Sequence, residues 1–225
     1  MASYQYRGIR LGDTAPTFDA HTTKGNFDFH TWKAGSWAIL FSHPADFTPV
    51  CTTELGAVAR LSAEWEKRGV KVIGLSTNEL GDHEKWIADI DSTQSCSVQF
   101  PIIADKDRKI AVLYDMLDHQ DITNVDAKGI PFTVRSVFII DPKNIVRLIL
   151  TYPASCGRNF NEILRTVDAL QLSDKQRVTT PAGWNGPQDE VIIHPSVTNA
   201  EAEKLFPGYR TVTPYLRVTK LPDTK

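Results

Sequence analysis

The chain has 225 residues, of which 41% are hydrophobic and 23% are charged, so it can bury one substantial core and keep a soluble surface. A formal net charge of -2 gives no electrostatic reason to expect nucleic acid or an anionic membrane as a partner. No apolar run approaches the roughly 20 residues of a membrane span, and the opening MASYQYRGIRLGD lacks the apolar stretch of a signal peptide, so we expect a cytoplasmic protein without stable membrane insertion.

Short apolar runs alternate with helical patterns along the first part of the chain. A predicted strand over 37–41 is followed, after a polar break, by a helix that starts at Cys51 and stops at Gly69. The later elements that we expect are strands at 70–75 and 101–104, helices at 83–90, 109–116 and 159–172, and a hairpin of strands at 134–140 and 145–151. This alternation favours an α/β fold with a central mixed sheet flanked by helices.

The composition changes after Leu172, where segment 179–187 is rich in turn-forming residues. We therefore expect one domain over 1–172 and a small C-terminal module over 173–225, with short strands at 190–193 and 215–219. The aromatic residues of the module predict that it is buried against another surface. These residues are Trp184, Phe206, Tyr209 and Tyr215.

The three cysteines, Cys51, Cys96 and Cys156, are odd in number and widely spaced, unlike a disulfide framework. There is no CxxC, no paired Cys/His cluster and no HExxH in the chain. We therefore expect no metal ion and no other cofactor. Cys96 and Cys156 are interpreted as structural thiols.

Cys51 stands at the predicted start of a helix. An ordinary cysteine with a pKa near 8.5 is only about 3% ionised at pH 7, so a reactive thiolate must be stabilised by its surroundings. With Thr48 as the N-cap and Pro49 at N1, Cys51 falls at N3, where unpaired backbone N-H groups and the positive end of the helix dipole favour an anion.

Arg135 lies in the predicted strand over 134–140 and, by the period of two, shares a face with Val137 and Ile139. A guanidinium is unusual on such a face unless it has an anionic partner. A thiolate would serve, because the forked donors of arginine reach two acceptors at once. The alternative is an arginine at the strand end whose head group reaches solvent.

Residues 41–55, FSHPADFTPVCTTEL, resemble the peroxidatic segment of the peroxiredoxins, whose pattern Pro-x-x-x-Thr-x-x-Cys is met by Pro44, Thr48 and Cys51. The Ser-His-Pro opening, segment 152–159 and the C-terminal module resemble the one-cysteine branch of that family. This resemblance covers essentially the whole chain. It implies a thioredoxin-like fold and a thiol-dependent peroxidase that reduces hydrogen peroxide and organic, including lipid, hydroperoxides.

Carried over by position, the resemblance implies that Cys51 is oxidised to a sulfenic acid and that Pro44 shields its thiol. Thr48 and Arg135 would hold the peroxide. Because the ionisation of a thiol accounts for at most about a 30-fold gain in rate, donors aimed at the leaving oxygen are also required.

Three further residues are implied as supporting groups: His43, Glu54 and Arg158. His43 would border the pocket, while Glu54 and Arg158 would brace the residues that touch the substrate. The alternative for His43 is a structural histidine whose ring nitrogens are hydrogen-bonded within the fold. The alternative for Glu54 and Arg158 is a purely structural ion pair.

Two-cysteine relatives carry a resolving cysteine in a Val-Cys-Pro-Ala-Gly-Trp segment, and here Thr180 takes its place within 178–184. This difference predicts that an external thiol restores Cys51, with glutathione, glutaredoxin, thioredoxin and ascorbate all open. Cys96 or Cys156 could replace the external thiol only if its Cα lay within about 7 Å of that of Cys51.

The resemblance also implies a homodimer, with the C-terminal module reaching across to the other subunit. A competing class is a chaperone or signalling protein that passes the oxidation of Cys51 on to partners. It needs the same thiol, so it stays open as an additional role.

Some members of this branch are credited with a phospholipase A2 activity on a Ser-His-Asp set, with the serine in a Gly-x-Ser-x-Gly context. Here Ser36 lies in segment 34–38, Ala-Gly-Ser-Trp-Ala, so both flanking glycines are replaced. His30 is present, but the expected acidic position holds Lys143, with Asp141 two residues earlier. Because a lipase turn needs small flanking residues and a triad needs a carboxylate, we do not expect this activity.

Overall fold

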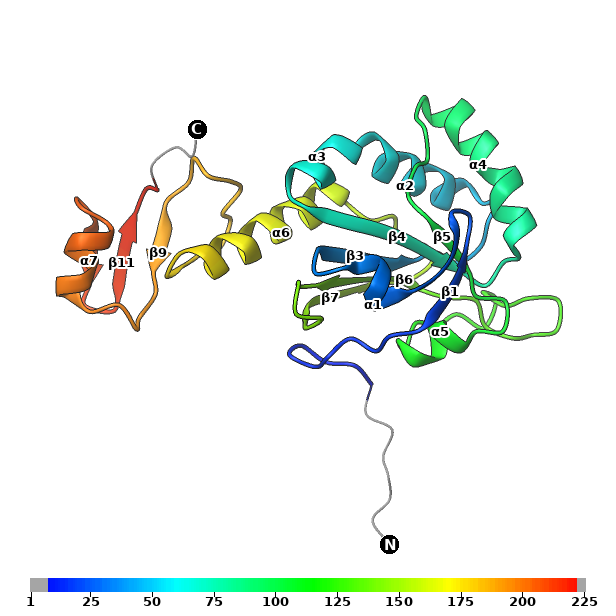
Figure 1. The fold of residues 1–225 in the computed structure, drawn as a ribbon, viewed down its shortest axis with the longest axis horizontal. Helices are drawn as coiled ribbons and strands as arrows, with labels where there is room; N and C mark the ends of the chain where they lie inside the picture. Colours follow the sequence, from blue (N-terminus) through cyan, green and yellow to red (C-terminus); the bar gives the residue numbers. More distant parts are fainter. Residues whose placement is uncertain (1–7, 222–225) are drawn as a thin grey trace, which may run out of the picture. The chain divides into compact units, whose positions relative to one another are not determined.

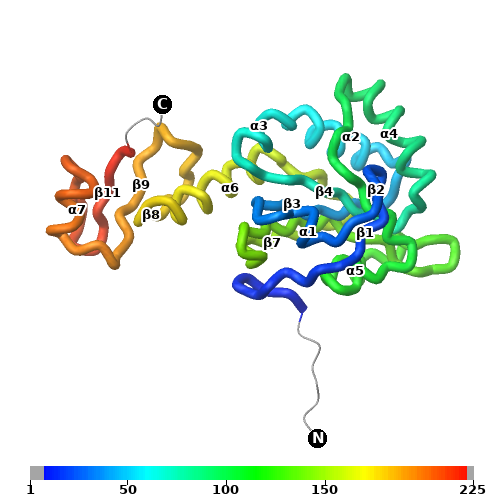
Figure 2. The backbone as a smooth tube through the Cα atoms, in the orientation of Figure 1, coloured from blue at the N-terminus to red at the C-terminus, as the bar shows by residue number. Residues whose placement is uncertain are grey.

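The computed structural model describes residues 8–221, which divide into two compact units between Phe160 and Asn161. Figure 1 shows the helices and strands, and Figure 2 follows the backbone in the same orientation. The strands of the first unit are β1 (Asp19–Thr22), β2 (Gly25–Asp28), β3 (Trp37–Ser42), β4 (Val70–Ser76), β5 (Ile102–Ala104), β6 (Arg135–Ile140) and β7 (Val146–Tyr152). Its helices are α1 (Phe29–Lys33), α2 (Pro49–Arg60), α3 (Ser62–Lys67), α4 (Leu80–Gln94) and α5 (Lys109–Leu113).

One mixed sheet forms the centre of the first unit, with its strands in the order β2-β1-β5-β4-β3-β6-β7. Strands β3, β4 and β5 run parallel to one another, whereas β6, β7, β1 and β2 pair antiparallel with their neighbours. Every residue of β3 is buried, because helices cover both faces of the sheet at its centre. The predicted α/β fold with a mixed central sheet is confirmed, and the predicted hairpin is formed by β6 and β7.

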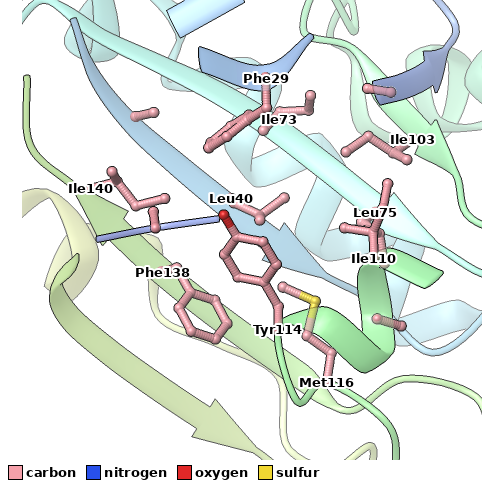
Figure 3. Packing of buried hydrophobic residues seen from close by; sticks show 14 of the residues in the cluster. Phe29, Leu40, Ile73, Leu75, Ile103, Ile110, Tyr114, Met116, Phe138 and Ile140 are labelled. Carbon is pink, nitrogen blue, oxygen red and sulfur yellow. The ribbon is translucent and has the colours of Figure 1, made fainter. Parts of the chain in front are cut away.

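The face of the sheet under α1 and α5 holds a continuous hydrophobic core (Figure 3). Leu40 of β3 and Phe138 of β6 lie opposite each other and point to this face, where they pack with Phe29 and Tyr114. The rings of Tyr114 and Phe138 meet edge to face with centroids 5.2 Å apart. This face is occupied by apolar packing and anchors the sheet.

The opposite face lies under α2 and α4, which Figure 1 shows on the other side of the sheet from α5. Phe41 of β3 and Val137 of β6 are partners across the strands and point to this face. Because Arg135 is two residues before Val137, its side chain emerges on the same face, toward the start of α2. The alternation of β6 therefore places Arg135 as the sequence predicts.

The predicted single helix from Cys51 to Gly69 is two helices, α2 and α3, that meet at Leu61. Leu61 has φ -91° and ψ 12°, and its N-H donates to the carbonyl of Val58 over 3.2 Å. The indole Nε1 of Trp65 donates to the same carbonyl over 3.0 Å. Two donors therefore hold the chain in a tight bend at this point, which the apolar spacing by itself does not indicate.

Several short elements were not predicted: β1, β2, α1, β8 (Val178–Thr179), α7 (Asn199–Leu205) and β10 (Arg210–Thr213). Each is seven residues or shorter, too short for a hydrophobic period to stand out. Helix α7 did carry a local signal, because Thr198 and Glu201 form a capping box at its start.

The second unit has its own sheet and its own core. Its elements are most of α6 (Phe160–Lys175), then β8 (Val178–Thr179), β9 (Val191–Ile193), α7 (Asn199–Leu205), β10 (Arg210–Thr213) and β11 (Leu216–Thr219). The strands pair in the order β10-β11-β9-β8. Trp184 and Phe206 are buried within this unit with Tyr209 packed on them, whereas Tyr215 is 83% exposed. Most of the aromatic residues that predicted a buried module therefore build its interior.

Within residues 8–221, no helix is long and apolar enough to cross a membrane. The same residues contain no group of three or more His, Cys, Asp or Glu side chains that could hold a metal ion.

Candidate active site

The first turn of α2 carries Cys51, whose side chain is almost completely buried. Thr48 is the N-cap, with φ -113° and ψ 146°, and Pro49 follows at N1, so Cys51 occupies N3 as predicted. The first backbone bond of the helix runs from Thr52 N to the Thr48 carbonyl over 3.0 Å. The N-H groups of Val50 and Cys51 precede it and have no acceptor inside the helix. The positive end of the helix dipole therefore lies at the sulfur.

The loop before α2 is closed by the side chain of Thr48. Its Oγ1 donates to the carbonyl of Ala45 over 2.9 Å and makes no capping bond to α2. Pro44 is buried in the same loop, and Phe47 takes a left-handed backbone conformation with φ 55°. The hydroxyl of Thr48 thus has its hydrogen directed into the loop and lone pairs left for another donor.

Arg135 reaches the start of α2 from the first position of β6. Its Nη1 lies 3.3 Å from the sulfur of Cys51 and 2.7 Å from Oε2 of Glu54. Its Nε and Nη2 donate to the carbonyl of Ala154 over 2.8 and 2.7 Å. Because Arg135 is only 3% exposed, its charge acts on the sulfur with little screening by water.

Glu54, one turn of α2 after Cys51, is held by a second arginine. Arg158 donates from its backbone N and its Nε to Oε1 over 2.7 and 3.0 Å, and from Nη2 to Oε2 over 2.8 Å. Burial raises the pKa of the Glu54 carboxyl, but the hydrogen bonds and charge of Arg158, with the charge of Arg135, hold this pKa below its ordinary value. Glu54 is therefore an anion between two guanidinium groups.

The charges of this buried cluster balance only if the sulfur is ionised. Arg135 and Arg158 carry two positive charges, and Glu54 supplies one negative charge. A Cys51 thiolate brings the sum to zero, whereas a thiol leaves an uncompensated buried cation, which is costly. The two guanidinium groups and Glu54 therefore place a net positive charge beside the sulfur of Cys51.

The loop 153–158 forms one wall of the site, because Ala154 binds Arg135 and Arg158 binds Glu54. Cys156 lies between these two anchors and is exposed. Cys96 lies elsewhere, after the end of α4, where burial raises the pKa of its thiol. The three cysteines are free thiols in this structure.

His43 is completely buried at the end of β3, and the structure gives it partners that sequence reasoning missed. Its Nε2 donates to Oδ1 of Asp46 over 2.8 Å, and Nδ1 of His83 lies 2.5 Å from the other oxygen of that carboxylate. Asp46 stood inside the quoted motif, and His83 stood at the start of the helix predicted over 83–90. The signal in the sequence was a polar residue at a position that the predicted loop or helix places inside the fold.

Two family models match this chain. Residues 11–149 match the AhpC/TSA family, and residues 169–208 match the C-terminal domain of 1-Cys peroxiredoxin. This chain belongs to the one-cysteine peroxiredoxins. As a peroxiredoxin it is a thiol-dependent peroxidase, and its fold is the thioredoxin-like fold of that family.

Relatives of this peroxiredoxin match over most of their length. The chain is 52% identical to the mitochondrial peroxiredoxin PRX1 of Saccharomyces cerevisiae, with 94% of this chain and 81% of that protein covered. It is 48% identical to human Peroxiredoxin-6, with 89% of each covered. Among solved structures, a mutant of Peroxiredoxin 6 of Arenicola marina superposes with a TM-score of 0.91 at 44% identity, over 96% of this chain and 100% of that one.

The yeast relative corrects the expected location of this peroxiredoxin. We predicted a cytoplasmic protein, yet a protein 52% identical over 213 residues is named mitochondrial. The prediction was wrong, because neither the net charge nor the lack of an apolar stretch distinguishes the cytoplasm from the mitochondrion.

The residues considered for a phospholipase activity are not arranged as a triad in this peroxiredoxin. Nε2 of His30 donates to the carbonyl of Ala15 over 2.9 Å, and its Nδ1 lies 3.4 Å from Nδ2 of Asn144. The carboxylate of Asp141 accepts from the backbone N-H groups of residues 143 and 145. None of the hydrogen bonds within residues 8–221 joins His30 to Ser36 or to Asp141. The geometry does not favour acyl hydrolysis.

Proposed function

We propose that Cys51 is the peroxidatic residue of this enzyme and that it reduces hydrogen peroxide and organic, including lipid, hydroperoxides. The thiolate attacks the hydroxyl oxygen of the peroxide, an S-O bond forms, and the O-O bond breaks. Cys51 becomes a sulfenic acid and the peroxide leaves as an alkoxide or hydroxide, which takes up a proton. The observation that carries the proposal is the contact of 3.3 Å between Arg135 Nη1 and the buried Cys51 sulfur.

Arg135 and Thr48 activate the peroxide in this proposal. Negative charge develops on the leaving oxygen as the O-O bond breaks, and a positioned guanidinium lowers the energy of that transition state. The backbone N-H groups of Val50 and Cys51 add fixed donors at the same end of α2. Pro44 excludes water from the sulfur, which strengthens these interactions.

Glu54, Arg158 and His43 are proposed as supporting residues. Arg158 holds Glu54 with two parallel side-chain bonds, and Glu54 in turn holds Arg135, so the guanidinium is aimed before substrate arrives. His43 is proposed to border the pocket, since Trp86 lies against its ring and donates to Thr52, the residue after Cys51.

An external thiol is proposed to restore Cys51, because Thr180 stands where two-cysteine relatives have their resolving cysteine. A solved structure of the yeast mitochondrial 1-Cys peroxiredoxin, 51% identical with a TM-score of 0.85 over 95% of this chain and 100% of that one, is described as resolving its thiol via glutathione and thioredoxin systems. We propose the same classes of donor here, with glutaredoxin as a third.

The proposed functional division is a peroxidase domain over residues 1–172 and a C-terminal module over 173–225. We also propose a homodimer. Strand β7 is seven residues long, contains no proline and lies at the edge of the sheet. Residues 12 and 13 bind the backbone of Val146 at the start of this edge, and the outward backbone groups toward Thr151 are left for a second copy. The resemblance of the whole chain to the one-cysteine branch supports this assembly.

Mass spectrometry of the reduced protein after one equivalent of hydrogen peroxide tests the proposal. We expect one added oxygen on Cys51, return to the thiol with glutathione, and no oxidation of the site in Cys51→Ser. The double variant Cys96→Ser/Cys156→Ser is the matched control and should turn over peroxide as the parent does. A disulfide between Cys51 and either other cysteine as the main product contradicts the one-cysteine cycle.

A further inference from the structure

Three titratable side chains form a buried chain behind the loop that carries Thr48. They are His43 at the end of β3, Asp46 in the loop and His83 in the first turns of α4, and each side chain is 0% exposed. Asp46 accepts at Oδ1 from His43 Nε2 over 2.8 Å and from Ser76 Oγ over 3.2 Å. At Oδ2 it faces His83 Nδ1 at 2.5 Å.

The partners of His83 determine how many protons it carries. Its Nδ1 faces the Asp46 carboxylate, and its Nε2 lies 3.1 Å from the backbone carbonyl of Ile103. Both groups are acceptors, whereas a neutral imidazole has only one N-H. Asp46 does not supply the missing proton, because hydrogen bonds from the two histidines outweigh its burial and bring the pKa of Asp46 down to about 2. The two contacts of His83 are therefore both satisfied only by a ring that donates from each nitrogen.

The same reasoning assigns the proton of His43. Its Nε2 donates to the Asp46 carboxylate, and its Nδ1 is buried without a hydrogen-bond partner among residues 8–221. Burial lowers the pKa of His43, with the Asp46 hydrogen bond and charge opposing, so the ring is neutral. Nδ1 of His43 therefore carries a buried lone pair that accepts no hydrogen bond from residues 8–221.

The charges that act on this chain come from all the elements packed around it. Asp46 lies in the loop before α2, His83 on α4 and His43 at the end of β3, with the two histidine ring centroids 6.3 Å apart. Ser76 of β4 and the Ile103 carbonyl of β5 are neutral, and Arg158 adds a positive charge felt by His43. His83 is the charged donor in direct contact with Asp46.

We propose that His83 is a positioning residue of the peroxidase, which as an imidazolium fixes the Asp46 carboxylate so that His43 keeps its proton on Nε2 and presents Nδ1 as an acceptor to an incoming peroxide hydroxyl. This inference rests on the proposed function of Cys51. The bond from the hydroxyl to Nδ1 orients the oxygen that Cys51 attacks, and no proton leaves that oxygen, because it stays in the sulfenic acid. His83 acts through Asp46 and His43 and does not touch the substrate.

Nitrogen NMR of the histidine rings in the reduced, unaltered protein tests the charge of His83 directly. At pH 7 we expect two protonated ring nitrogens for His83, and one protonated Nε2 with a bare Nδ1 for His43. A neutral His83 overturns the inference. This measurement does not involve peroxide, so its result stands whether or not Cys51 proves to be the peroxidatic residue.

Two substitutions separate the hydrogen bonds of His83. His83→Asn places an amide nitrogen near the position of Nδ1, where it can donate to Asp46, whereas His83→Gln places one near Nε2, where it reaches only Ile103. His21→Asn, on the exposed surface of β1, is the matched control. The parent protein is assayed alongside, so that a failure of Cys51 to react with peroxide is recognised as a failure of the proposed function.

The rate constant for oxidation of Cys51 by hydrogen peroxide is the readout, followed by rapid mixing from pH 5 to 8. We expect His83→Gln to lose about tenfold and to gain a pH dependence from His43, and His83→Asn to stay within about threefold of the parent. Equal losses in both variants with an unchanged pH profile would show that His83 only packs, and would overturn the inference. If either variant does not fold, the ring spectra of the unaltered protein decide the question.

Discussion

Nη1 of Arg135 lies 3.3 Å from the sulfur of Cys51, although 84 residues separate the two in the chain. This contact joins the first residue of β6 to the first turn of α2. It places a permanent cation beside the proposed nucleophile at the positive end of a helix.

Arg135→Lys should lower the rate constant for oxidation of Cys51 by hydrogen peroxide at least about 10²-fold, since one lysine ammonium cannot serve the sulfur, Glu54 and the Ala154 carbonyl together. Stopped-flow tryptophan fluorescence of the reduced protein measures this rate. Arg147→Lys, on the neighbouring strand β7, is the control and should leave it unchanged. A rate within a few-fold of the parent would show that a point charge suffices.

Glu54→Gln should destabilise the protein by about 3–5 kcal/mol, because removal of one partner leaves the guanidinium groups of Arg135 and Arg158 buried without their counter-charge. Urea unfolding followed by circular dichroism gives the free energy. Glu64→Gln breaks an ion pair with Arg68 at the surface and should not shift the urea midpoint measurably. Similar midpoints for the two variants would mean that the buried cluster contributes little.

Acid should destabilise the protein through Asp46 and His43. The pKa of Asp46 is lowered from its ordinary value of 3.8 to about 2 in the folded protein, so its contribution of about 2 kcal/mol is present above pH 3.8 and is lost as pH falls toward 2. The pKa of His43 is lowered from 6.5, so its contribution to the free energy of unfolding starts to decrease as pH falls below 6.5. Asp46 and His43 therefore act in the same direction, and the free energy of unfolding should rise as pH increases across this window.

Urea midpoints between pH 7 and pH 2 measure this dependence. Asp46→Asn should be less stable than the parent at pH 7 and should show a flatter slope at low pH, because the carboxyl that must be protonated is gone. Asp19→Asn, exposed on β1, should reproduce the parent slope. An unchanged slope in Asp46→Asn would assign the acid sensitivity to other groups.

Thr151→Pro should convert the proposed homodimer to a monomer. Ser136, the partner of Thr151 on β6, donates its N-H to Ser42 Oγ on the β3 side, so the backbone groups of this pair do not bond each other and the Thr151 N-H points to the free edge of β7. Proline removes that N-H without breaking the ladder to β6. Thr151→Val keeps the N-H and should stay dimeric. Sedimentation velocity gives the masses, and a dimer of Thr151→Pro would place the interface elsewhere.

Features that depend on neighbouring residues could be predicted from the amino-acid sequence. Thr48, Pro49 and Cys51 specify a helix start and a thiol at its third position, because capping and the φ of proline act within one turn. The period of two in β6 assigned Arg135 to the correct face of the sheet. The segments around Pro44 and Thr180 indicated the family and the missing resolving cysteine.

The contacts between groups far apart in the chain could not be predicted and follow from the folded arrangement of the strands and helices. Glu54 meets Arg135 and Arg158 across 81 and 104 residues, and Asp46 meets His83 across 37. Local patterns assign a side chain to a face but not to a partner, because the partner depends on strand order and on how long connections close. The charge balance at Cys51 and the proton count of His83 follow from those long-range contacts, so they became visible only in the folded chain.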